Sequence, residues 1–147
     1  MGFKLGRNKV RKITYKYFPK DRDELRVILK KRLAEDKNAN LNDIDVSEIT
    51  DMNDLFLGLD PHNIDISEWN VLNVENMYGM FSACVNFNSD LSNWNTSNLI
   101  DMKYMFYFCR KFEGNGLEKW NVSKVKYMKD ALEYCESLKK LPSWYKN

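Results

Sequence analysis

Residues 80–106 read MFSACVNFNSDLSNWNTSNLIDMKYMF, and the pattern in this stretch recurs along the chain with a nearly constant spacing. Four tryptophans follow one another at intervals of 25, 26 and 24 residues, and a methionine column and a phenylalanine column keep step with them. The columns are Trp69, Trp94, Trp120 and Trp144; Met52, Met77, Met102 and Met128; and Phe56, Phe81 and Phe106. Such a period is typical of units that bury their apolar side only by stacking on their neighbours. The sequence therefore predicts a solenoid with its functional residues on the surface.

Within one copy, the apolar spacing predicts a helix followed by a short strand. Leu99, Met102, Met105, Phe106 and Cys109 fall at steps of three, three, one and three, which places them on one side of a helix. We therefore expect helices over 49–59, 74–84, 98–109 and 125–135. The next apolar residues alternate with polar ones, as in an extended segment, namely Leu117, Trp120 and Val122. The expected fold class is an α/β solenoid of about four 25-residue helix-plus-strand units.

The first 40 residues do not share the repeat and are expected to cap it. Residues 9–18 alternate loosely between basic and apolar or aromatic side chains, which is typical of a strand. An amphipathic helix is expected from Asp21 to about Asn38, with Leu25, Leu29 and Leu33 on its apolar face. The expected organisation is a cap over 1–40 and a repeat domain with a C-terminal half repeat over 41–147.

The cysteines of the sequence suggest packing rather than chemistry. Cys84, Cys109 and Cys135 each follow the Phe or Leu of their own copy by three residues, so they form a column of small buried side chains. A zinc site needs closely spaced cysteines or histidine partners, and His62 is the single histidine. With no phosphate-binding loop and no Ser/His/Asp constellation, we expect no metal, no cofactor, no catalytic residue and no enzymatic activity.

Charge is distributed unevenly along the chain, although the net charge is only +2. Residues 1–32 contain 12 Lys or Arg against three Asp or Glu, residues 33–109 contain two against 13, and residues 110–147 contain nine against five. Such polarity steers association with a complementary partner, and it equally fits a solvated surface. It also suggests nucleic-acid binding through a basic N-terminal cluster as an alternative, namely Lys4, Arg7, Lys9, Arg11 and Lys12.

Two features of the sequence bear on its location. No apolar run approaches the roughly 20 residues that cross a bilayer. The N-terminal segment is basic but has no continuous apolar core of the kind found in secretory signals. The sequence as written therefore predicts a cytoplasmic protein without a membrane span.

The chain resembles the BspA-like leucine-rich repeat surface proteins of the Met-Phe-x-x-Cys variety, which are found in bacterial lipoproteins. The resemblance is carried by LNDIDVSEITDMNDLF (41–56), by the stretch over 80–106 and by WNVSKVKYM (120–128), with YKYFPKDRDELRVIL (15–29) similar to their N-terminal lead-in. It implies a bacterial or phage source, a leucine-rich-repeat-like solenoid, binding of other macromolecules or cells, and a cell-surface location as the alternative. It supplies no catalytic residues.

These observations favour a protein-interaction module, such as an intracellular inhibitor or adaptor; a signal-free relative of bacterial adhesion proteins is the alternative. The expected partner is a protein with a basic surface, because the middle repeats are acidic. Tyr104 and Tyr107 stand three apart, and tyrosine is a frequent interface anchor. The candidate binding residues face away from the apolar columns on the expected helices (Glu75, Tyr78, Asp101, Tyr104 and Tyr107) or strands (Glu68, Asn70, Asn93 and Asn95). The choice between these faces and the oligomeric state stay open.

Overall fold

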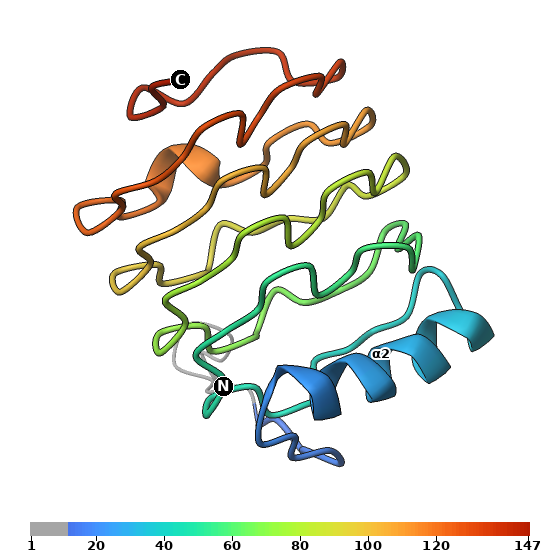
Figure 1. Cartoon of the computed structure of the whole chain (residues 1–147). Helices are drawn as coiled ribbons and strands as arrows, with labels where there is room; N and C mark the ends of the chain where they lie inside the picture. Colours follow the sequence, from blue (N-terminus) through green and yellow to red (C-terminus); the bar gives the residue numbers. More distant parts are fainter. Residues whose placement is uncertain (1–11) are drawn as a thin grey trace, which may run out of the picture.

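The computed structural model describes residues 12–147 and contains very little regular secondary structure (Figure 1). The α-helix α2 (Arg22–Glu35) lies at one end of the molecule, and a single 3-10 turn, η1 (Leu117–Lys119), occurs further along the chain. Between α2 and the C-terminal end, the chain lies in irregular loops that are stacked one over the next (Figure 1).

The predicted α/β, leucine-rich-repeat-like solenoid of helix-plus-strand units is wrong. Residues 12–147 contain one α-helix and no sheet, and none of the four helices expected over 49–59, 74–84, 98–109 and 125–135 forms. Leu117–Lys119 is a 3-10 turn where a strand was expected. Of the strand expected over 9–18, the part within the described residues forms one isolated bridge, between Tyr17 and Ile44.

The expected helices fail because many of their backbone N–H groups bond to a neighbouring loop, while others close tight turns with the carbonyl three residues back, such as Met105 N with Met102 O. Phe81 N donates to Met105 O at 2.8 Å, and Phe106 N donates to Ala131 O at 2.9 Å. Gly79 and Ala83 also have φ values of 61° and 60°, which an α-helix cannot contain. Successive tight turns therefore return the apolar side chains to one side, and their spacing imitates that of a helix.

Isolated parallel bridges connect equivalent positions of successive loops. One row of bridges joins Asp51 to Asn76, Asn76 to Asp101, and Asp101 to Tyr127. Backbone hydrogen bonds flank this row on both sides, such as those from Met77 N to Asp101 O and from Glu75 N to Thr50 O, each 2.8 Å long. Residues that are 25 or 26 positions apart in the sequence therefore lie above one another in these loops.

The core between the two sides of the loops is built from stacked aromatic rings. The indoles of Trp69, Trp94, Trp120 and Trp144 form a continuous stack, with centroid distances of 6.4, 6.1 and 6.4 Å and interplanar angles of 3°, 13° and 2°. Each indole Nε1 also donates to a carbonyl of an earlier loop, for example from Trp94 to Ile66 O at 2.9 Å. The stack therefore buries large apolar area without leaving its polar N–H groups unsatisfied.

The expected N-terminal helix is confirmed as α2, although it ends at Glu35 and not near Asn38. Asp21 caps it by accepting a hydrogen bond from Glu24 N at 2.9 Å, as Asp does at helix starts. Leu25, Leu29 and Leu33 are buried, so the apolar face packs on the core as the sequence predicts. The helix therefore covers the end of the stacked loops.

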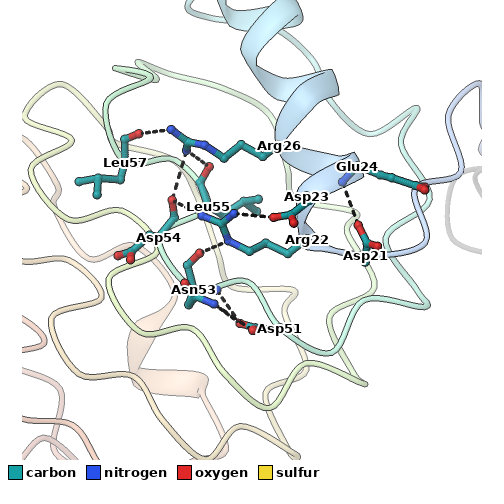
Figure 2. A network of polar contacts seen from close by, with 10 residues as sticks. All are labelled: Asp21, Arg22, Asp23, Glu24, Arg26, Asp51, Asn53, Asp54, Leu55 and Leu57. Carbon is teal, nitrogen blue, oxygen red and sulfur yellow. Dashed lines mark hydrogen bonds and ion pairs between the residues drawn. The ribbon is translucent and has the colours of Figure 1, made fainter.

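Two arginines of α2 also satisfy the open backbone edge of the first loop. Figure 2 shows the Arg26 guanidinium donating to Leu55 O at 2.8 Å and to Leu57 O at 2.7 Å, while Arg22 donates to Asn53 O. In the stacked loops, carbonyls of this kind accept bonds from N–H groups of a neighbouring loop. The guanidinium groups thus replace those donors, which matters because unpaired backbone groups are costly to bury.

Candidate functional site

The most distinctive surface feature is a cluster of tyrosine and phenylalanine rings on the outer side of the stacked loops. Tyr104 contacts Tyr78 and Tyr107 edge-on, with centroid distances of 5.6 and 5.5 Å. Tyr134 contacts Tyr107 at 5.7 Å and stacks on Phe108 at 4.5 Å with an interplanar angle of 17°. Phe108 and Tyr134 are 39% and 52% exposed, so the cluster is open to solvent. We call these five rings together with Tyr127 the aromatic face.

Tight turns with left-handed backbone conformations place these rings outward. Tyr104, Phe108 and Tyr134 have φ values of 56°, 59° and 62°. The position equivalent to Phe108 in the first loop is Gly58, with φ of 79°, so this position of the turn has a left-handed backbone conformation. Residues with a Cβ pay roughly 1–2 kcal/mol for this conformation, and a bulky residue adopts it rarely. The later loops therefore carry large aromatic side chains where glycine suits the turn best.

Charged groups lie beside the rings. The Lys103 ammonium nitrogen lies over the Tyr78 ring at 5.6 Å and over the Tyr127 ring at 5.1 Å from the centroids. The pKa of the Tyr107 hydroxyl is raised, chiefly by desolvation and further by the negative charges of Tyr134 and Asp130, and then of Tyr104 and Glu133. Acidic side chains thus accompany the rings, whose π-faces themselves attract cations.

The aromatic face includes part of the candidate set drawn from the sequence. Tyr78, Tyr104 and Tyr107 come together in it, and Asp101 lies beside them because it pairs with Tyr127 in the bridge row. Sequence reasoning missed Phe108, Tyr127 and Tyr134. A signal was available for Phe108 and Tyr134, which occupy the same position of successive copies and directly follow the position of Tyr107. No such signal marks Tyr127.

The other candidate residues are not part of this cluster. Glu75 is exposed, and its backbone belongs to the bond row next to Asn76. Asn70 and Asn95 accept hydrogen bonds from the N–H groups two residues ahead, which are Leu72 N and Ser97 N, both at 3.1 Å. These asparagines therefore shape their own turns. Glu68 N donates to Asn42 Oδ1 at 3.0 Å, and Asn93 is exposed.

A second, polar feature lies at another turn of the loops. The Asp60 carboxylate contacts His62 Nε2 at 3.1 Å and accepts a bond from Asn86 at 3.0 Å. The Asn86 bond is the main reason why the pKa of Asp60 is lowered, and desolvation by burial opposes this shift. His62 and Asn86 line a shallow depression with Lys111, Glu113 and Ser137. Its acidic, basic and neutral groups are mixed, so it favours no single ligand charge.

The cysteine column lies inside the core. Cys84, Cys109 and Cys135 are buried as free thiols, and each donates to a phenylalanine carbonyl of an earlier loop. The Cys109 bond to Phe81 O measures 2.9 Å, and burial raises the pKa of this thiol well above its ordinary value. A thiol is a poor nucleophile and a poor metal ligand in its protonated form. Within residues 12–147, no three His, Cys, Asp or Glu side chains are grouped as metal ligands.

Two remaining expectations concern the N-terminal cluster and the membrane. Lys4, Arg7, Lys9 and Arg11 of the basic cluster lie outside the described residues, whereas Lys12 is exposed. In the described part of the chain, no helix has the length and apolar character that crossing a membrane requires.

Comparison with known sequences identifies one family. The sequence model of a family described as "Mycoplasma protein of unknown function, DUF285" matches residues 27–144. This range includes most of α2, all of the stacked loops that form the aromatic face, and the complete tryptophan stack. Comparisons with curated proteins and with solved structures found no match.

Proposed function

The chain belongs to the DUF285 family, described as Mycoplasma proteins of unknown function, and from its aromatic face we propose that it is a non-enzymatic module that binds a protein partner. The binding surface is the aromatic face, a set of exposed and half-buried rings on the second, third and fourth loops, which are Tyr78, Tyr104, Tyr107, Phe108, Tyr127 and Tyr134.

The single observation that carries this proposal is the conformation of the exposed rings. Phe108 and Tyr134 are large, solvent-accessible and held at positive φ, where glycine would relieve the backbone. Burial does not explain why aromatic residues stand there, because Phe108 is 39% and Tyr134 is 52% exposed. Sparsely populated backbone conformations cluster at ligand-binding sites, where the surrounding structure holds them. Binding explains these residues better than folding does.

The chemistry of the face favours a protein with a basic surface. Tyrosine offers a large contact area with little rotamer freedom to lose, which is why it is frequent at protein interfaces. Asp101, Asp130 and Glu133 lie around the rings, whereas Lys103 and Lys129 stand in one column of the same side. Because both signs are present, we expect binding to weaken only modestly as salt rises.

A glycine variant tests the proposal, because it separates binding from folding. Phe108→Gly combined with Tyr134→Gly removes both exposed rings and also relieves two left-handed backbone positions. We expect its melting temperature to stay near that of the wild type, while the affinity for the partner falls at least about tenfold, as loss of interface anchors does. The partner is first recovered on immobilised wild-type protein from cells that express the chain, and its affinity is then measured with purified components.

The matched control is Asn70→Ala with Asn95→Ala, which changes two exposed residues away from the aromatic face. The control protein should retain the recovered partner. If the glycine variant retains it equally well, or if only the asparagine variant loses it, the binding surface is not the aromatic face.

A further inference from the structure

One lysine of the chain lies between two rings of the aromatic face. Lys103 extends from the third loop, Tyr78 from the loop before it and Tyr127 from the loop after it, and the ammonium lies over both rings at 5.6 and 5.1 Å. None of the ion pairs formed within residues 12–147 involves Lys103. Its ammonium is therefore held by ring faces and not by a carboxylate.

The backbone of both tyrosines is held by hydrogen bonds that do not involve the side chain of the lysine. Tyr78 O accepts from Asp54 N at 2.8 Å, and Tyr78 N donates to Asn76 Oδ1 at 2.9 Å. Tyr127 O accepts from Met102 N at 2.8 Å. The lysine, in contrast, reaches the slot between the two rings at the end of a flexible four-carbon chain. Its ammonium forms none of the bonds that hold the backbone of the two tyrosines.

We propose that the slot between Tyr78 and Tyr127 is a binding site for an arginine side chain of the partner protein, and that Lys103 is its internal, displaceable occupant. This inference rests on the proposed function and identifies the chemistry by which the partner is recognised. An arginine fits better than a second lysine, because the planar guanidinium is weakly hydrated and stacks on aromatic faces. Asp101, which lies between Asn76 and Tyr127 in the bridge row, adds a negative charge beside the slot.

Displacement predicts that removing the lysine improves binding. A fluorescent peptide of alternating glycine and arginine is the probe, and its affinity is measured by anisotropy at constant salt. Lys103→Ala should bind this peptide about two- to fivefold more tightly than the wild type, since an exposed cation–π contact has about this strength. Tyr127→Ala in the Lys103→Ala background should reverse the gain.

Two controls separate ring recognition from charge. Lys129→Ala removes the same charge from the next position of the same column, since Met102 and Met128 are equivalent. It should therefore strengthen binding less than Lys103→Ala does. The same peptide with citrulline in place of arginine keeps the shape but has no charge, and it should bind far more weakly. Melting curves of all variants verify that the fold is retained.

Three results overturn the inference. These are equal gains for Lys103→Ala and Lys129→Ala, equal binding of the citrulline peptide, and no binding of the arginine peptide to either the wild type or Lys103→Ala. They leave the proposed function intact if Phe108→Gly with Tyr134→Gly still loses the partner protein. If that glycine variant keeps its partner while Tyr78→Ala and Tyr127→Ala weaken binding of the arginine peptide, the slot is an arginine site but the wider aromatic face is not the binding surface for the partner.

Discussion

Two groups of aromatic rings lie in opposite surroundings in this molecule: the tryptophan column, which keeps the repeat spacing, and the aromatic face, whose rings come from several positions of the repeat. The tryptophans from Trp69 to Trp120 are at most 5% exposed, lie nearly parallel and donate every indole N–H to a backbone carbonyl. The rings of the aromatic face meet mostly edge-on, and Tyr127 and Tyr134 are 51% and 52% exposed. The two groups of rings therefore differ in burial and in ring geometry as well as in their spacing along the chain.

The tryptophan column and the aromatic face differ in the hydrogen bonds of their polar groups and in their backbone conformation. The backbone of Trp94 has no positive φ. Its indole is buried, and the indole N–H donates to Ile66 O. The aromatic face includes three residues at positive φ, and Phe108, Tyr127 and Tyr134 are exposed. The buried tryptophans stabilise the folded state, whereas the exposed rings of the aromatic face are accessible to another molecule.

The largest expected effect comes from breaking the buried column. Trp94→Ala should destabilise the protein by about 3–5 kcal/mol, because it opens a cavity and leaves the Ile66 carbonyl without its indole donor. Domains of this kind have a total stability of about 5–15 kcal/mol, so the variant is expected to be largely melted at moderate temperature. Thermal and urea unfolding followed by circular dichroism measure the difference.

Tyr127→Ala is the matched variant from the aromatic face. It removes an aromatic ring of similar size from a 51% exposed position, and its cost should stay within about 0.5–1 kcal/mol. If Trp94→Ala melts within a degree or two of Tyr127→Ala, the tryptophan column is not the core and the comparison fails.

A smaller change in stability is expected for variants of the buried cysteines, which test whether water is excluded from the core. Cys109→Ala should cost about 1–2 kcal/mol, because a small buried side chain shrinks and its bond to Phe81 O is lost. Cys109→Asp should cost clearly more, because a carboxylate at this site would be buried without a partner charge. Reductant and chelator should both leave the wild-type melting temperature unchanged, and a drop with chelator would show that metal holds the column.

The sequence predicts the buried columns better than the path of the backbone. Trp94, Met102 and Phe106 are buried because a regular apolar spacing must face a core in any fold. The same spacing gave the wrong secondary structure, since turns at Ala83 and Phe108 repeat the apolar side of the chain as a helix would. Side-chain spacing carries no information on where a backbone N–H bonds, and here many of the acceptors lie about one loop ahead.

The candidate binding residues were predictable only where a helix and a turn expose the same positions. Tyr104 and Tyr107 project outward in either geometry, so the expected helix and the observed turns both bring their rings together. Phe108 and Tyr134 stand at left-handed positions of the turns, and nothing in the local sequence marks a phenylalanine or tyrosine as adopting that conformation. Only Gly58, in the same column, hinted at it.

The smallest expected effect concerns the titration of the Tyr107 hydroxyl, on the aromatic face, at alkaline pH. The pKa of Tyr107 is raised above its ordinary value of 10.0, first by desolvation and then by neighbouring negative charge. In the unfolded chain the hydroxyl ionises near pH 10, whereas the folded protein keeps the proton to higher pH. Its contribution to stability is therefore complete below pH 10 and is lost as the pH rises through the folded pKa.

Tyr107→Phe removes this titrating group and keeps the ring, so its melting temperature should decline less steeply above pH 10 than that of the wild type. Glu133→Gln should instead keep the group and move its tyrosinate absorbance to lower pH, because one of the charges that raises the pKa is gone. Desolvation is the larger cause, so this shift should be only partial. Identical alkaline slopes for the wild type and Tyr107→Phe would place Tyr107 fully in water, and the aromatic face would then be a set of separate side chains.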